Sequence, residues 1–159
     1  MALCTYLTLK ADGSDVEGES KKTSHEREGT IECFSFEYGV ASGGSTQSGS
    51  GASGDIEYEP IRIVKAIDRS TPLLWHAMIE NHDVEAVFKF FRPKEVGKGD
   101  EHYYTTTIAR GRVTSIDFQS PYAGMGDEPT ETVTFSYNEI RQEYIPGSTE
   151  AEDSFAERE

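Results

Sequence analysis

The stretch "ETVTFSYNEIRQEYI", residues 131–145, alternates apolar and polar side chains and then changes phase. Apolar residues occupy every second position up to Tyr137, and the next ones come at Ile140 and Tyr144. Successive side chains of a strand point to opposite faces, so the change moves the buried face unless the strand bends or bulges. Bent strands of this kind form the corners of small barrels and orthogonal sandwiches. We therefore predict a closed β-barrel.

The same alternation recurs along most of the chain. Gly111 interrupts it within "TTTIARGRVTSIDF", residues 105–118, which predicts a second bent strand. The strand-like runs are rich in Thr, Val, Ile, Tyr and Phe, as pleated packing favours. Besides 131–145, they cover residues 3–9, 33–38, 57–67, 84–92 and 102–119. The fold class is therefore mainly β.

One segment, "DRSTPLLWHAMIENH", departs from this pattern and predicts a helix of roughly ten residues. Thr71 suits its cap, Pro72 its first position, and Asn81 with His82 its end. Apolar side chains spread over more than half of its circumference, whereas packing on a single core needs a stripe only somewhat wider than about 100°. Part of this surface is therefore expected to meet another chain.

The length and the net charge of the chain limit the functions that it can have. The 159 residues fit one domain. There are 15 Lys and Arg against 29 Asp and Glu, a formal net charge of −14. Nucleic acids and anionic membranes are bound by dense basic surfaces, so we expect neither partner. No run approaches the roughly 20 apolar residues of a membrane span, and "MALCTYLTLK" lacks the pattern of a cleaved signal peptide. Any export is expected to proceed without one.

Catalytic, cofactor and metal sites are not expected. There is no G-x-S-x-G motif, and neither "GKGDEH" nor "GMGDEP" continues into a phosphate-binding pattern. The four histidines, His25, His76, His82 and His102, lack the spacing of metal ligands. The sequence therefore favours a protein that works by binding or assembly.

The segment "ASGGSTQSGSGASG", residues 41–54, lies between two predicted strands. Compact domains rarely contain so long a connection without a use. Ordering each residue costs about 1–2 kcal/mol of backbone entropy, which a glycine-serine segment cannot offset internally. We expect a flexible loop that becomes ordered on contact with another subunit. The alternative is a surface loop without a role.

Several longer motifs resemble those of the hemolysin-coregulated protein (Hcp) family, which forms the tube of bacterial type VI secretion. They are "ALCTYLTL", "VEGES", "IECFSFEYG", the glycine-serine segment, "VKAIDRSTPLLWHAM", "AVFKFFRP" and "ETVTFSYNEIRQEYIP", in matching order over about residues 2–146. The chain departs from the family where Phe36 or Tyr38 replaces a frequent Trp. It also has Asn81 and His82 where the family often has Gly-Lys-His.

The resemblance implies a small two-sheet β-barrel flanked by one short α-helix, similar to phage tail-tube proteins, over residues 1–146. Residues 147–159 are then expected to form an acidic, mobile tail. It further implies a non-enzymatic subunit of a homo-hexameric ring. Rings would stack into a tube with spike, sheath and effector proteins as partners. The protein would start in the bacterial cytoplasm and then be secreted. The alternative is a monomeric β-barrel that binds a small apolar ligand.

Three sets of residues are candidates for these roles. Ser35 and Glu37 alternate with the aromatic residues Phe34, Phe36 and Tyr38, which we expect inside the barrel, so the first two are candidates for the lumen wall. Trp75 and Ile79 are candidates for the subunit interface, with core packing as the alternative for Trp75. The candidates for ring stacking are Gly43, Gly44, Ser45, Gln47, Gly49 and Gly51.

Overall fold

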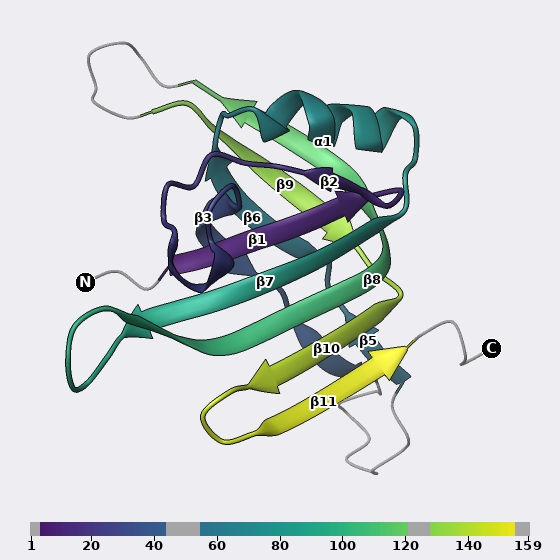
Figure 1. Cartoon of the computed structure of the whole chain (residues 1–159). Coiled ribbons are helices and arrows are strands. Elements are labelled where there is room, and N and C mark those ends of the chain that lie inside the picture. The colour runs from purple at the N-terminus through teal and green to yellow at the C-terminus, as the bar shows by residue number, and fades with distance from the viewer. Residues whose placement is uncertain (1–3, 44–54, 121–127, 155–159) are drawn as a thin grey trace.

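The computed structural model describes residues 4–43, 55–120 and 128–154. Figure 1 shows a strongly curved sheet with a single α-helix lying across one end of it. The strands are β1 (Cys4–Ala11), β2 (Ser14–Val16), β3 (Ile31–Glu37), β4 (Val40–Gly43), β5 (Asp55–Tyr58), β6 (Ile61–Ala66), β7 (Val84–Pro93), β8 (Asp100–Gln119), β9 (Thr130–Ser136), β10 (Glu139–Tyr144) and β11 (Thr149–Ser154). The helices are α1 (Ser70–Ile79) and a short 3₁₀ turn, Ser24–Glu26.

Six strands close into a barrel, as predicted. The order β8-β7-β1-β3-β6-β9 returns to its start because β9 also pairs with β8. β10 and β11 extend the sheet beyond the barrel, β2 pairs with β1, and β4 and β5 form a separate two-stranded sheet. The prediction of a mainly β, two-sheet barrel flanked by one short helix is confirmed.

The long strand β8 explains how the barrel closes. Its first half pairs with β7 and β10, and its second half pairs with β9. The change occurs at Arg110, whose φ is +51°, and at Gly111, where a Cβ would collide with the carbonyl oxygen of Ser136. Glycine is required there because two backbones approach closely, so the predicted bend at Gly111 is confirmed.

The phase change in residues 131–145 is a break between two strands. β9 ends at Ser136 and β10 begins at Glu139, with Tyr137 buried and Asn138 in the turn. β9 pairs with the second half of β8, where Ser136 lies opposite Arg112. β10 pairs with the first half of β8. The predicted single run at 57–67 is also two strands, because Glu59 and Pro60 separate β5 from β6.

The predicted mobile tail is wrong over residues 149–154. These residues form β11, which pairs along its length with β10. Apart from Thr149, its six residues, "TEAEDS", lack the β-branched and aromatic side chains that identify strands in a sequence. The strand forms because β10 offers an unpaired edge and Asp153 accepts a hydrogen bond from the hydroxyl of Tyr58 at 2.8 Å. The last five residues lie outside the described ones.

The assignment of faces on β3 also needs correction. A bulge between Cys33 and Ser35 shifts the register against β6. Cys33 is buried in the core, Phe34 is 55% exposed, and Phe36 packs against the core from the other side of the bulge. The expectation that Phe34 points into the barrel is therefore wrong. Simple alternation failed because a bulge places two consecutive residues against one partner.

The helix has the predicted length but a different start. Asp68, not Thr71, caps it: the Asp68 carboxylate accepts a hydrogen bond from the backbone N–H of Ser70 at 2.8 Å. Thr71 instead accepts one from the N–H of Asp68 at 3.0 Å, a reciprocal arrangement similar to a capping box. Pro72 is the third residue of α1. At the other end, Asn81 has a φ of +54°, which is the left-handed backbone conformation in which helices commonly end.

Candidate assembly surfaces

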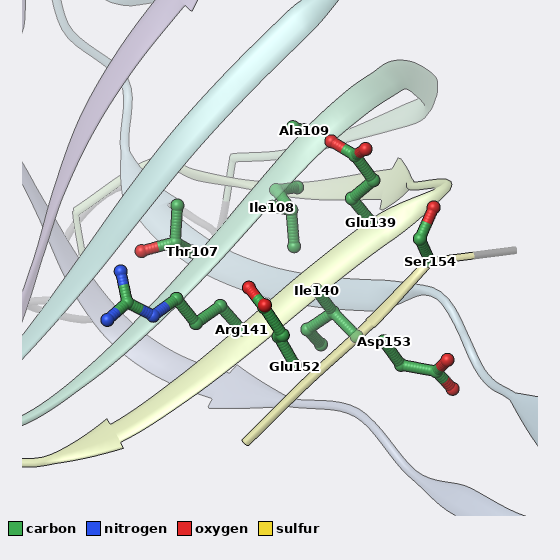
Figure 2. Close-up of a pocket in the computed structure, with 9 residues that line it drawn as sticks. All are labelled: Thr107, Ile108, Ala109, Glu139, Ile140, Arg141, Glu152, Asp153 and Ser154. Carbon is green, nitrogen blue, oxygen red and sulfur yellow. The ribbon is translucent and has the colours of Figure 1, made fainter. Parts of the chain in front are cut away.

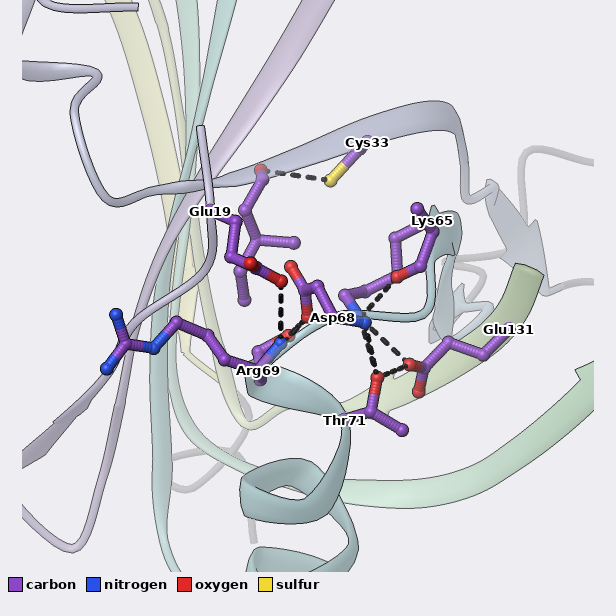
Figure 3. A network of polar contacts seen from close by, with 10 residues as sticks. Glu19, Cys33, Lys65, Asp68, Arg69, Thr71 and Glu131 are labelled. Carbon is purple, nitrogen blue, oxygen red and sulfur yellow. Dashed lines mark hydrogen bonds and ion pairs between the residues drawn. The ribbon is translucent and has the colours of Figure 1, made fainter. Parts of the chain in front are cut away.

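A buried ionic network holds the first turn of α1 against β6 and β9 (Figure 3). The Nζ of Lys65 lies 2.8 Å from the carboxylate of Glu131 and 3.1 Å from that of Asp68. Thr71, in the first turn, lies within hydrogen-bonding distance of Lys65 and also bonds to Glu131. The side chains of Lys65 and Glu131 are fully buried. Because a buried charge is tolerated only with such partners, the network fixes the position of the helix on the barrel.

Two neighbours extend this network. The backbone N–H of Arg69 donates to a carboxylate oxygen of Glu19 at 2.9 Å, which ties the loop after β2 to the helix start. The thiol of Cys33 is free and buried, and this burial raises its pKa far above the usual range despite the opposing charge of Lys65. A thiol in this state is an inert core group, not a nucleophile.

The outer face of α1 is apolar and exposed. Leu74 and Ala77 face the core, whereas Leu73, Trp75 and Ile79 are 43%, 48% and 68% exposed. Core packing as the role of Trp75 is therefore ruled out. Trp75 and Ile79 are one turn apart and share a face, which we call the helix ridge, whereas Leu73 lies on a flank of the helix. An exposed Trp beside an exposed aliphatic side chain is the composition of an interface anchor.

The two candidates for the lumen wall share the outer surface of β3 with an unexpected aromatic residue. Glu37 is exposed and forms an ion pair with Arg62 of β6 at 3.1 Å, and Ser35 is exposed as well. Phe34, which the sequence placed inside, adds an exposed ring to this region. The assignment of this wall to a lumen stays a prediction.

The candidate stacking segment is flanked by the β4–β5 hairpin. Residues 41–43 belong to β4, so the first part of the predicted loop is a strand. Gly43 pairs with Asp55 at the end of the hairpin. The other candidates, Gly44, Ser45, Gln47, Gly49 and Gly51, lie outside the described residues. The hairpin itself lies at the end of the molecule opposite α1 (Figure 1).

A polar groove of about 630 Å³ crosses β8, β10 and β11 (Figure 2). Its charged side chains include Glu139, Arg141, Glu152 and Asp153. Arg141 pairs with Glu150, and Arg110 lies 2.7 Å from Glu139 across the neighbouring strands. The sequence did not indicate this groove because β11 was not expected. Charged side chains of the groove thus form ion pairs with residues of neighbouring strands. This arrangement suits a solvated surface of the sheet better than a reaction centre.

A second cluster fastens the segment before β3 to β1 and the β7–β8 hairpin. The guanidinium of Arg27 is almost fully buried, lies 4.2 Å from the ring centroid of Phe91 and pairs with Asp100 at 3.2 Å. His102 stacks on the other side of this region against Phe91. Burial is the main cause that lowers the pKa of His102, with the charge of Lys89 adding to it.

The described residues contain no group of acidic, histidine and cysteine side chains that could hold a metal ion. In the same part of the chain, no helix has the length and apolarity to cross a membrane.

Comparison with known proteins identifies the architecture. The family described as "Type VI secretion system effector, Hcp" matches residues 6–144. Hcp1 from the E. coli EAEC 042 pathovar is 24% identical with a TM-score of 0.83, over 97% of this chain and 99% of that one. Hcp3, a secreted protein from Pseudomonas aeruginosa, is 18% identical with a TM-score of 0.76, over 97% and 99%. Hcp1 from Salmonella typhimurium is 21% identical with a TM-score of 0.72, over 96% of both chains. No curated protein sequence matches.

Proposed function

Since the chain belongs to the Hcp family of type VI secretion proteins, which are structural and not enzymes, we propose that it is a tube subunit. Six copies close into a ring, and rings stack into the inner tube that the apparatus ejects. Effectors travel in the lumen. The spike closes the tip of the tube and the contractile sheath surrounds it. The subunit is made in the bacterial cytoplasm and leaves the cell through the apparatus.

The helix ridge is the observation that carries this proposal. The chain has a net charge of −14, yet Trp75 and Ile79 present an exposed apolar surface on one face of a short helix. Their burial by another copy would stabilise an assembly by roughly 25 cal/mol for each Å² of apolar surface removed from water. The monomeric binder is disfavoured because side chains such as Phe88, Phe135 and Ile63, all fully buried, occupy the interior.

Native mass spectrometry and negative-stain imaging of the purified protein test the proposal. We expect hexamers and rings. Trp75→Ala should give folded monomers, because Trp75 is half exposed in the single chain and its loss leaves the core intact. Val96→Ala is the matched control, since Val96 is also an exposed apolar residue but lies in the turn between β7 and β8, and it should keep the rings. Wild-type protein that stays monomeric would refute the proposal.

Ring stacking is assigned to the glycine-serine segment at 44–54. Its role is supported by β4 and β5, which flank the segment in the sequence and pair with each other at the end of the molecule opposite α1. Shortening the segment by half should leave single rings intact and reduce the length of tubes seen by electron microscopy. Tubes of unchanged length would assign stacking to another surface.

The lumen is assigned to the wall that carries Ser35 and Glu37. An exposed polar surface there would hold water and cargo without sticking to them. A bulky label on Glu37→Cys should reduce the amount of effector that co-purifies with the ring, whereas a label on Val96→Cys, in the exposed β7–β8 turn, should not. Equal retention by both labelled proteins would place the lumen elsewhere.

A further inference from the structure

The β4–β5 hairpin has an apolar face that is covered at Tyr58, which packs against Tyr137 and bonds to Asp153, and is exposed at Val40 and Ile56. Val40 lies opposite Tyr58, and Ser42 lies opposite Ile56, so Val40, Ile56 and Tyr58 share one face. Val40 is 54% exposed and Ile56 is 38% exposed. The two strands pair only with each other among the described residues. An isolated two-stranded hairpin is at best marginally stable in water, so a partner on this face would stabilise it.

This face leads into a pocket of about 230 Å³ at the base of the hairpin. Its lining is Ile56, Tyr58, Pro60, Ser136 and Tyr137. The hydroxyl of Tyr137 donates to the carbonyl oxygen of Glu59 at 2.7 Å, and the rings of Tyr58 and Tyr137 pack edge to face at 6.0 Å. The hydroxyls of both tyrosines are thus engaged within the chain, since that of Tyr58 donates to Asp153 at 2.8 Å. The pocket is preformed, which reduces the entropy lost on binding.

The helix ridge is apolar, as are most of the side chains that line this pocket, but the two cannot meet in one chain. Figure 1 shows α1 across one end of the barrel and β5 near β10 and β11 at the other end. The buried network of Lys65 and Glu131 holds α1 in place. The ridge must therefore meet the pocket of a second copy.

A ring of identical subunits requires such a pair of unlike surfaces. Rotational rings other than dimers are built from head-to-tail contacts, in which one patch of each subunit meets a different patch of the next.

We propose that the helix ridge of one subunit inserts into the Ile56–Tyr58–Tyr137 pocket of its neighbour, with Trp75 as the anchor. The proposal rests on the ring assembly put forward above and names the two surfaces that meet. Each subunit offers one ridge and one pocket, so repetition of the contact closes the ring and buries the open face of every hairpin.

Two substitutions test the two sides separately. Ile56→Lys places a charge at the pocket and should raise the concentration needed for half-assembly at least ten-fold, as Trp75→Ala should from the other side. Val96→Lys adds the same charge at an exposed turn and should leave assembly unchanged. Far-ultraviolet circular dichroism establishes that each variant is folded. When the two defective variants are mixed, one intact contact remains between unlike chains, so heterodimers should form.

A covalent test locates the contact. The double variant Ile56→Cys/Ile79→Cys should form disulfides between chains on mild oxidation, giving a ladder up to the hexamer, and neither single variant should do so. Rings that survive Ile56→Lys, together with no ladder from the double variant, would overturn the inference while leaving ring assembly standing. Wild-type protein that never forms rings would instead refute the proposed function.

Discussion

Replacement of Lys65 by methionine should destabilise the protein strongly. Methionine keeps most of the length and apolar volume of lysine but removes the ammonium group, which lies 2.8 Å from the carboxylate of Glu131. Glu131 is fully buried, and one of its oxygens, Oε1, has no hydrogen-bond partner among the described residues. After Lys65→Met, a carboxylate would remain in the interior with only the hydroxyl of Thr71 against it.

The expected loss follows from the burial of both partners. Removing one member of a buried ion pair costs about 3–5 kcal/mol, because the remaining charge is left without compensation. For a domain of this size, 1 kcal/mol corresponds to roughly 2–4 °C, so the melting temperature should fall by roughly 6–20 °C. The double variant Lys65→Met/Glu131→Leu removes both charges and should recover most of the loss. Asp68 keeps its hydrogen bond to the N–H of Ser70 in both variants.

Thermal unfolding followed by circular dichroism measures the effect. All variants are compared at one protein concentration, because assembly adds to apparent stability. Arg62→Met is the matched control, since Arg62 lies on the same strand and pairs with Glu37, but both side chains are more than half exposed. It should cost less than about 1 kcal/mol. A loss of less than about 1 kcal/mol in Lys65→Met, or a double variant as unstable as the single one, would refute this reasoning.

Three further predictions follow from other parts of the molecule. The pKa of His102 is lowered by burial, so the unfolded chain takes up this proton first as the pH falls below about 6.5. The free energy of unfolding should therefore drop in that range, and urea titrations of His102→Gln should show a smaller drop. Gly111→Ala should cost about 1–3 kcal/mol in the same assay, because its Cβ would collide with the backbone of Ser136. Light scattering should show that added salt promotes assembly, since each subunit carries a net charge of −14; assembly that weakens with salt would contradict this.

The barrel could be predicted because the strand breaks and bends at its corners are visible as changes in the local alternation of apolar and polar residues. The break after Tyr137 and the bend at Gly111 both change the buried face within a few residues, and both are positions where strand pairing changes. The helix could be predicted for the same reason, since Pro72 and the apolar run after it fit no strand. Local sequence patterns are sufficient to predict features that depend on one strand or one helix alone.

Features that depend on a partner far along the chain could not be predicted. β11 has a strongly acidic sequence and forms only because β10 offers an edge. The bulge after Cys33 is set by the register against β6, so Phe34 faces outward although the sequence alternates without interruption. The pocket at Tyr58 and Tyr137 joins residues 79 positions apart, and no local signal marks it.

The motif "KAIDRSTPL" is one of the most specific parts of the family resemblance, and its residues show that different side chains determine the fold and the interface. Lys65, Asp68 and Thr71 engage one another and Glu131 beneath the helix, so this part of the motif determines where α1 sits on the barrel. The ridge that points outward is formed by residues after the motif, Trp75 and Ile79. A relative could therefore keep the network and change the ridge, provided that the pocket of the neighbouring copy changed with it. Exchange of the ridge alone between two family members should then disrupt their rings, and simultaneous exchange of ridge and pocket should restore them.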